Sequence, residues 1–260
     1  MTQHLIFYGP EGAGKKTRAI TFIQEVYGVN SLQLNEEDRV LKPEGTTKTI
    51  EYTIFSSHHH IEITPADNDN DDRFIVQNVV KEIASSKAVG GQKSAKDFKI
   101  LVINEADRLS KEAQGSLRRT MEKYISHCRM ILLCKNIHKL IMPIRSRCIN
   151  LRVPAPTNDH IADVLVSIAR ENHLDVSEEI IGKILQTSGR NMRDAVSQLE
   201  CYKYSKKNDD IMHPYKPEIK EIAKLVFQEQ SPAQLQKIRG IFYDLLVNCV
   251  PGNLIIKMVL

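Results

Sequence analysis

The 260-residue chain combines 42% hydrophobic and 26% charged residues with a net charge of +4 at pH 7, a balance typical of a globular protein rather than a disordered one. No run approaches 18 uncharged apolar residues, and the opening MTQHLIFY lacks the basic flank and cleavage site of a signal peptide, so no membrane partner is expected. Five cysteines without a C-x-x-C pair favour neither disulfides nor zinc and predict a reducing compartment.

The first predicted elements surround a glycine-rich loop. Residues 4–8, HLIFY, are a short apolar run that predicts a strand, and residues 15–27 carry an apolar stripe at helical spacing. Between them lies GPEGAGKKT. Strand, loop and helix in this order are typical of a phosphate-binding loop, whose backbone N–H groups surround phosphates while a lysine reaches the terminal ones. The predicted nucleotide-binding residues are Gly9, Gly12, Ala13, Gly14, Lys15, Lys16 and Thr17.

Lys16 stands where such loops carry the Ser or Thr that ligates Mg²⁺. An ammonium has donors and no lone pair, so it cannot ligate a cation. Thr17 is one residue late, about 100° around the helix, and we do not expect it to substitute. The loop therefore predicts binding of ATP or ADP, with Mg²⁺ held weakly or not at all.

Residues 49–57 and 61–65 alternate polar and apolar side chains as paired strands, and His58, His59 and His60 lie between them. Adjacent residues of a strand face opposite sides. We therefore do not expect the three histidines to converge on one metal ion.

A continuous apolar run at 98–104, FKILVIN, predicts a buried strand of a parallel sheet. It ends in Asn104, where related ATPases have an acid that holds Mg²⁺, followed by Glu105 in the position that activates the attacking water. The neutral amide is the weaker ligand for a hard dication. An ordinary helix cap after a strand is the alternative interpretation of this segment.

Another buried strand is predicted at 128–134 and is followed by PIRSRC at 143–148. Together with GPEGAGKKT, INEADRLSKEAQ and LRRTMEKY, this segment resembles the AAA+ small subunits of eukaryotic replication factor C, which are clamp loaders. The resemblance covers nearly the whole chain. It is strongest to the member with a GKKT loop, which supports the ring with little hydrolysis of its own.

The resemblance implies roles for several residues. Arg147 would be an arginine finger that reaches the γ-phosphate held by a neighbouring subunit. Lys135 falls where the family has a sensor asparagine, with Asn136 beside it, and Arg193 would contact the phosphates of this subunit's own nucleotide. A helix opening at Asp72 would follow DNA backbone, with Arg73, Lys81 and Lys111 as phosphate contacts. Solvated surface charge is the alternative interpretation for Lys81 and Lys111. Arg118 and Arg119 could form a nucleic-acid patch, but local pairing with Glu122 at helical spacing is the simpler interpretation.

The predicted fold is α/β: an AAA+ P-loop core at 1–152 with a parallel sheet between helices, a three-helix lid at 153–208, and a partial helical collar at 209–260. Lid helices are predicted at 158–173, 177–186 and 191–204, and collar helices near 218–229 and 232–247. Polar segments at 85–97 and 205–217 are expected to be a loop and a linker. Because only the first part of a collar is visible, we expect either a shortened chain or a divergent short form.

The function implied is a nuclear clamp-loader subunit that helps load the sliding clamp onto primer-template DNA in replication and repair. Its partners would be the other subunits of a hetero-pentamer, the clamp and DNA backbone. Two alternatives stay open: an autonomous P-loop ATPase acting on DNA that uses Glu105, and a shared subunit of a checkpoint-type loader.

Overall fold

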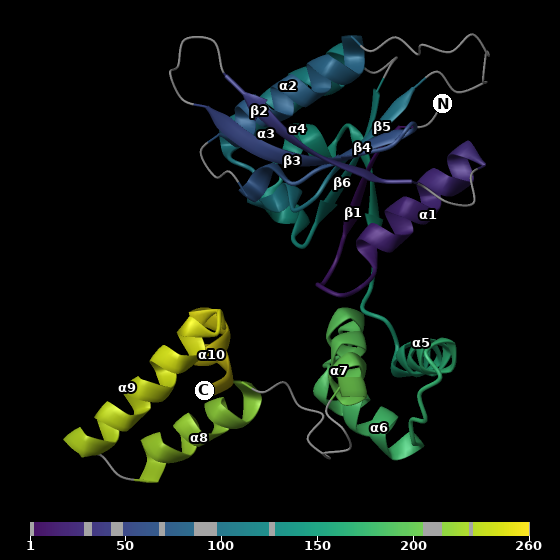
Figure 1. Cartoon of the computed structure of the whole chain (residues 1–260). Coiled ribbons are helices and arrows are strands. Elements are labelled where there is room, and N and C mark those ends of the chain that lie inside the picture. The colour runs from purple at the N-terminus through teal and green to yellow at the C-terminus, as the bar shows by residue number, and fades with distance from the viewer. Residues whose placement is uncertain are drawn as a thin grey trace. The chain divides into compact units, whose positions relative to one another are not determined.

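The computed structural model describes residues 3–28, 33–42, 49–67, 71–85, 98–124, 128–204, 215–228 and 231–259. The chain divides into two compact units, residues 1–155 and 156–260 (Figure 1). The expected loop and linker fall outside the described residues, except that Ser85 ends a helix and residues 215–217 begin one.

A seven-stranded sheet forms the centre of the first unit, in the order β2-β3-β4-β5-β6-β1-β7. Strands β4, β5, β6, β1 and β7 are parallel, whereas β2 and β3 extend the sheet with antiparallel pairs. The strands are β1 (His4–Tyr8), β2 (Asn35–Leu41), β3 (Ile50–Ser56), β4 (His60–Ile63), β5 (Lys99–Ile103), β6 (Cys128–Cys134) and β7 (Cys148–Arg152).

Helices cover both faces of this sheet. They are α1 (Lys15–Tyr27), α2 (Asp72–Ser85), α3 (Lys111–Lys123) and α4 (Met142–Arg145), with short 3₁₀ turns η1 (Pro65–Asp67), η2 (Ala106–Arg108) and η3 (Ile137–Lys139). Alternate residues of β1 serve opposite cores: Leu5 and Phe7 pack with Ile23 of α1, and Ile6 packs in the cluster that includes α2 and α3 residues. The predicted α/β class, with a largely parallel sheet between helices, is confirmed.

The register places four functional loops at one edge of the sheet. Ile63, Ile103 and Leu132 are aligned across β4, β5 and β6, and Tyr8 is aligned with Cys134. Because these strands are parallel, the segments that follow them all emerge at the carboxyl edge. The glycine loop, Thr64, Asn104 and Lys135 are therefore neighbours.

The second unit is entirely helical in its described elements. It comprises α5 (Asn158–Glu171), α6 (Glu178–Thr187), α7 (Met192–Tyr204), α8 (Tyr215–Gln228), α9 (Pro232–Val247) and α10 (Gly252–Val259). One apolar core joins α5, α6 and α7, and a separate one joins α8, α9 and α10. The helices predicted in this region are confirmed to within two or three residues. Helix α8 begins before the predicted start because Pro217 is tolerated in a first helical turn.

Two strands of the sheet lack a clear signal in the sequence. Strand β2 reads NEEDRVL and has no buried residue, so it lacks the apolar alternation that marks a strand. Strand β7 follows Arg147 directly and is mostly exposed, at the edge of the sheet beside β1. The arginine segment therefore precedes the last strand of the parallel core, whereas the sequence pattern places that last strand at β6. No helix of the described residues is long and apolar enough to cross a membrane.

Candidate functional site

The glycine loop between β1 and α1 is shaped to receive an anion (Figure 1). Gly12 and Gly14 have φ values of 66° and 80°, the left-handed region that glycine adopts without strain. No side chain caps the first turn of α1, so its N–H donors are available for phosphate oxygens. The Nζ atom of Lys15 curls over the loop, 2.8 Å from the carbonyl oxygen of Gly9 and 2.7 Å from that of Pro10.

Gly9 lies against the backbone of Val153, just beyond β7. A Cβ atom at position 9 would come within 2.0 Å of the Val153 carbonyl oxygen. Any side chain at position 9 would therefore clash with backbone. Ala13 is buried in the core beneath α1.

Lys16 makes an ion pair with Glu62, a carboxylate of β4 that is almost fully buried while the lysine side chain is 51% exposed. The amide nitrogen of Asn104 donates to the same Glu62 oxygen at 2.7 Å and lies 3.3 Å from the Thr64 hydroxyl. The two residues at the magnesium positions thus both point N–H donors at one carboxylate. Thr17 is exposed on α1. The uncapped first turn of α1 fits a phosphate group, whereas the N–H donors of Lys16 and Asn104 do not fit Mg²⁺.

Glu105, predicted to activate water, has a left-handed backbone with φ of 48°. Its carboxylate is 2.7 Å from Nη1 of Arg108, and both side chains are about half exposed. Glu105 occupies the N-cap position of η2, but its side chain makes no capping hydrogen bond. The side chain is therefore held by an exposed ion pair, a contact that exchanges readily.

The sensor position is also paired. Nζ of Lys135 lies 2.5 Å from a carboxylate oxygen of Glu11 in the glycine loop. Asn136 uses its side-chain oxygen to accept the His138 N–H at 3.0 Å, which caps η3. The side-chain oxygen of Asn136 thus caps the local turn, and compensation by Asn136 for the sensor side chain stays a prediction.

Arg147 lies between α4 and β7 and is 35% exposed in its side chain. Its Nε and Nη2 atoms lie 2.8 Å and 2.5 Å from one oxygen of Glu122 on α3, and Nη1 donates to the Pro143 carbonyl at 2.8 Å. Arg118 is 3.9 Å from the same oxygen, so the predicted pairing of Arg118 with Glu122 is confirmed. Arg147 is nevertheless the closer partner of Glu122.

The DNA-contact candidates lie on α2 and α3. Asp72 joins the starts of these helices by accepting the Ser110 backbone N–H at 2.6 Å and its hydroxyl at 2.9 Å. This bond brings Arg73 and Lys111, both exposed, to adjacent helix ends. The Nη1 atom of Arg73 lies 3.2 Å from a carboxylate oxygen of Glu112.

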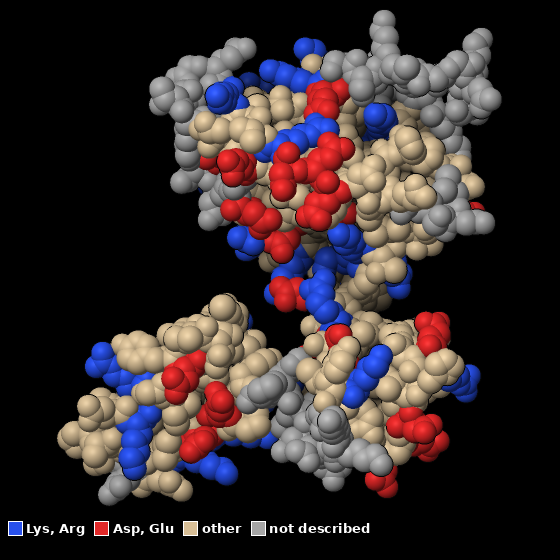
Figure 2. Space-filling model, viewed as in Figure 1, with Lys and Arg blue, Asp and Glu red and all other residues tan. Residues whose placement is uncertain are grey.

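Lys81 is exposed about two turns further along α2. Figure 2 shows basic side chains interspersed with a cluster of acidic ones on the first unit, so net charge alone does not mark a DNA surface. Arg193 is exposed in the first turn of α7, and its contact with nucleotide stays a prediction.

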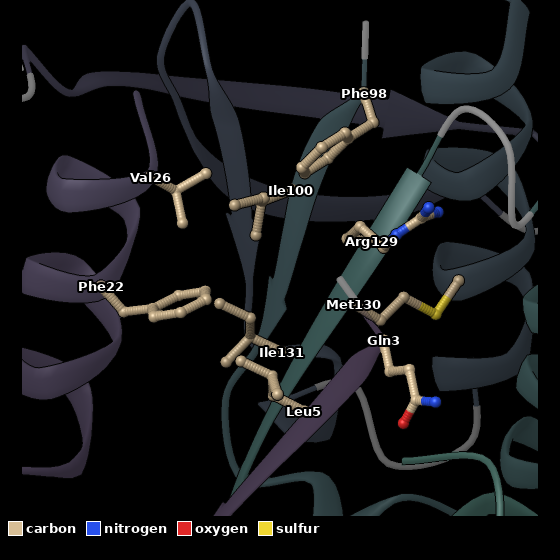
Figure 3. A pocket seen from close by; sticks show the side chains of 9 residues that line it. All are labelled: Gln3, Leu5, Phe22, Val26, Phe98, Ile100, Arg129, Met130 and Ile131. Carbon is tan, nitrogen blue, oxygen red and sulfur yellow. The ribbon is translucent and has the colours of Figure 1, made fainter. Parts of the chain in front are cut away.

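A small hollow lies on the α1 side of the sheet, away from the glycine loop (Figure 3). Phe22 and Val26 of α1 point toward Ile100 and Ile131 of neighbouring strands. The lining is mostly apolar but includes Gln3 and Arg129, and it contains none of the candidate site residues. Within the described ranges, no group of three or more His, Cys, Asp or Glu side chains is placed to hold a metal ion.

Sequence reasoning misses most of the acidic partners in the site. It does not single out Glu62 or Glu11, and it assigns Glu122 to Arg118 and Arg119 rather than to Arg147. Each of these carboxylates pairs with a lysine or arginine that is itself a candidate. Of these three carboxylates, only Glu62 is indicated by the sequence. It lies inside the short apolar segment HIEI, and a glutamate in a buried strand requires a cationic partner.

Comparison with known proteins gives consistent results along the chain. A family model described as DNA polymerase III, delta subunit matches residues 1–157, and one described as replication factor C subunit 3, C-terminal domain matches residues 215–260. The chain is 43% identical to a probable replication factor C subunit 3 of Dictyostelium discoideum, covering 99% of this chain and 75% of the relative. It is 37% identical to replication factor C subunit 3 of Homo sapiens, covering 98% and 72%.

Among solved structures, a single-residue variant of RuvB from Thermotoga maritima aligns with a TM-score of 0.53 at 16% identity, covering 87% of this chain and 68% of that one. A second structure of that protein, titled a Holliday junction branch migration motor, aligns with a TM-score of 0.52. This similarity concerns the fold, which is of the AAA+ type.

Proposed function

Because the chain belongs to the replication factor C subunit 3/5 family of clamp-loader components, we propose that it binds a nucleotide it hydrolyses little and completes the active site of a neighbouring subunit. Its setting would be a nuclear hetero-pentamer that loads the sliding clamp onto primer-template DNA in replication and repair. In this role the chain contributes to the ATPase activity of the complex more than to its own.

The observation that carries the proposal is the contrast between the glycine loop and its surroundings. The loop keeps its turns and its exposed N–H donors, so binding of ATP or ADP is supported. The positions that would hold the metal are Lys16 and Asn104, both engaged with Glu62. Without metal ligands, charge that develops on the transferring phosphoryl group is poorly neutralised.

Arg147 supports the second half of the proposal. Its side chain is partly exposed, and its guanidinium is held by the Glu122 carboxylate and the Pro143 carbonyl. An arginine supplied by a neighbouring subunit in phosphoryl transfer raises the rate by about 10³- to 10⁵-fold. When Arg147 leaves the Glu122 carboxylate to contact a neighbour's γ-phosphate, its guanidinium is paired with an anion both before and after the move.

The paired starts of α2 and α3 support DNA binding. Asp72 joins the two helix starts, and the exposed side chains of Arg73 and Lys111 lie there, which is chemistry suited to backbone phosphates. Lys81 would extend the contact along α2. Contacts of this kind give affinity without sequence preference.

The experiment is Arg147→Ala in the reconstituted complex. DNA-stimulated ATP hydrolysis should fall by about 10³-fold at the neighbour's site, while nucleotide binding to this chain stays unchanged. Arg170→Ala is the matched control, because Arg170 is an exposed arginine near the end of α5. Full ATPase activity with Arg147→Ala would remove the finger assignment.

The autonomous ATPase is tested on the isolated chain. Turnover near one ATP per second, a rate in the ordinary enzyme range, and its loss in Glu105→Gln, would favour that function over the proposed one. Co-purification with four related subunits would support the loader role. The identity of those subunits would distinguish a replication loader from a checkpoint-type loader.

A further inference from the structure

We propose that Lys16, held by the Glu62 carboxylate to which Asn104 also donates, takes the place of Mg²⁺ at this site, so that the glycine loop binds the metal-free nucleotide. The inference rests on the proposed function, because it concerns how the same glycine loop binds its nucleotide. It assigns Glu62 a positioning role in that binding.

The geometry begins with Glu62. Its side chain is only 2% exposed, and a buried carboxylate requires a cationic or hydrogen-bonding partner. Lys16 supplies the cation and Asn104 supplies an N–H at 2.7 Å to the same oxygen. Glu62 is thus fixed by two donors, and it fixes Lys16 in return.

The position of Lys16 determines what this pair can do. Lys16 lies in the first turn of α1, next to Lys15, and its side chain is half exposed. An ammonium has three N–H donors, and the Glu62 oxygen occupies one. The Phe55 ring lies 5.7 Å from the same ammonium, and an N–H directed at neither Glu62 nor this ring can donate to a phosphate oxygen of a nucleotide in the loop.

A magnesium ion would be disfavoured in the same place for two reasons. Lys16 would repel it, since like charges a few ångströms apart repel strongly away from bulk water. The amide of Asn104 directs its nitrogen, which cannot ligate a metal, toward Glu62. Metal-free nucleotide carries more negative charge than its magnesium complex, and the additional charge favours a site with two adjacent lysines.

The test is a titration of the full chain with a fluorescent ATP analogue, once in excess MgCl₂ and once in excess EDTA. We expect the wild-type chain to bind at least as tightly in EDTA. The double variant Lys16→Thr/Asn104→Asp restores a hydroxyl and a carboxylate. It should bind the ATP analogue more tightly with Mg²⁺ than in EDTA, by a factor of about ten or more.

Two single variants complete the design. Glu62→Gln is nearly isosteric and should lower affinity in EDTA several-fold, because Lys16 is no longer held. Arg18→Gln removes a positive charge from an exposed position in the same turn of α1 and should leave the magnesium dependence unchanged. Circular dichroism of each variant confirms that it is folded.

The outcomes separate the two proposals. Binding by the wild-type chain that requires Mg²⁺, as in the double variant, would overturn the metal-replacement inference and leave nucleotide binding in place. An unchanged EDTA affinity in folded Glu62→Gln would refute the positioning role of Glu62. Absence of nucleotide binding in either buffer would overturn both this inference and the nucleotide-binding part of the proposed function.

Discussion

Replacement of Gly9 by alanine should destabilise the first unit through a backbone clash, in addition to the strain of a φ of +157°. The added Cβ atom would lie 2.0 Å from the carbonyl oxygen of Val153 and 3.1 Å from its carbonyl carbon, whereas real Cβ contacts are essentially never under 3.0 Å. Val153 is buried, and its N–H donates to the Tyr8 carbonyl at 2.8 Å. Because both clashing groups belong to backbone that is tied to the sheet, neither can rotate away.

The magnitude follows from the required displacement. Relief of the clash means moving backbone by roughly an ångström, which costs about 1–3 kcal/mol as overpacking. Weakening of the Val153–Tyr8 hydrogen bond adds about 1 kcal/mol. A total of about 2–4 kcal/mol corresponds to a fall in melting temperature of about 4–16 °C for a unit of this size.

Gly14→Ala is the matched control in the same loop. No atom lies within 4 Å of the Cβ position at Gly14, but φ is +80° there, so its cost is left-handed strain alone, about 1–2 kcal/mol. Thermal unfolding followed by circular dichroism measures both variants. A Gly9→Ala chain that melts with the wild type, or a Gly14→Ala chain that is the less stable of the two, would refute the reasoning.

Two further predictions concern acid stability and DNA binding. Burial lowers the pKa of His4 and of His60 below the usual 6.5. Below pH 6.5 the unfolded chain therefore binds more protons than the folded chain does. The free energy of unfolding should thus be at its full value above pH 6.5 and should fall on acidification. Denaturant titrations at pH 7 and pH 5.5 measure this fall in the free energy of unfolding, and the fall should be smaller in the double variant His4→Gln/His60→Gln. A fall of the same size in that variant would mean that the two histidines do not cause it. For the loader, Arg73→Ala should weaken duplex DNA binding and reduce the slope of log K against log salt by about 0.9, while Glu112→Gln should strengthen binding by releasing Arg73; an unchanged slope would remove α2 from the DNA path.

The parts of the fold predicted from sequence are those in which local pattern and burial agree. Strand β6 is confirmed at the predicted residues because its apolar side chains are buried on both faces of the sheet. Helix α1 is confirmed because its stripe meets the core at Ala19 and Ile23. Strands β2 and β7 lie at the two edges of the sheet, where exposed polar residues are tolerated and the periodic signal is lost.

The sequence reveals the side-chain N–H donors of the site and conceals most of the carboxylates that accept from them. Lys16 and Asn104 depart from a pattern with fixed spacing, so each is visible in the sequence alone. Glu62 is separated from Asn104 by 42 positions, and it reaches the site because β4 pairs with β5 in parallel. Strand order of this kind depends on tertiary packing, which no single segment encodes.

The ion pairs around the nucleotide loop differ in how firmly they fix the site. Exposed pairs such as Arg108 with Glu105 contribute about 0.2–1 kcal/mol, so Glu105 can leave Arg108 at little cost. The pair of Lys16 with Glu62 is different, because removal of the lysine alone leaves a buried carboxylate without a cation, which is strongly destabilising. Lys16→Thr by itself should therefore cost stability without creating a metal site. Recovery of magnesium binding should therefore require coordinated changes on α1 and after β5.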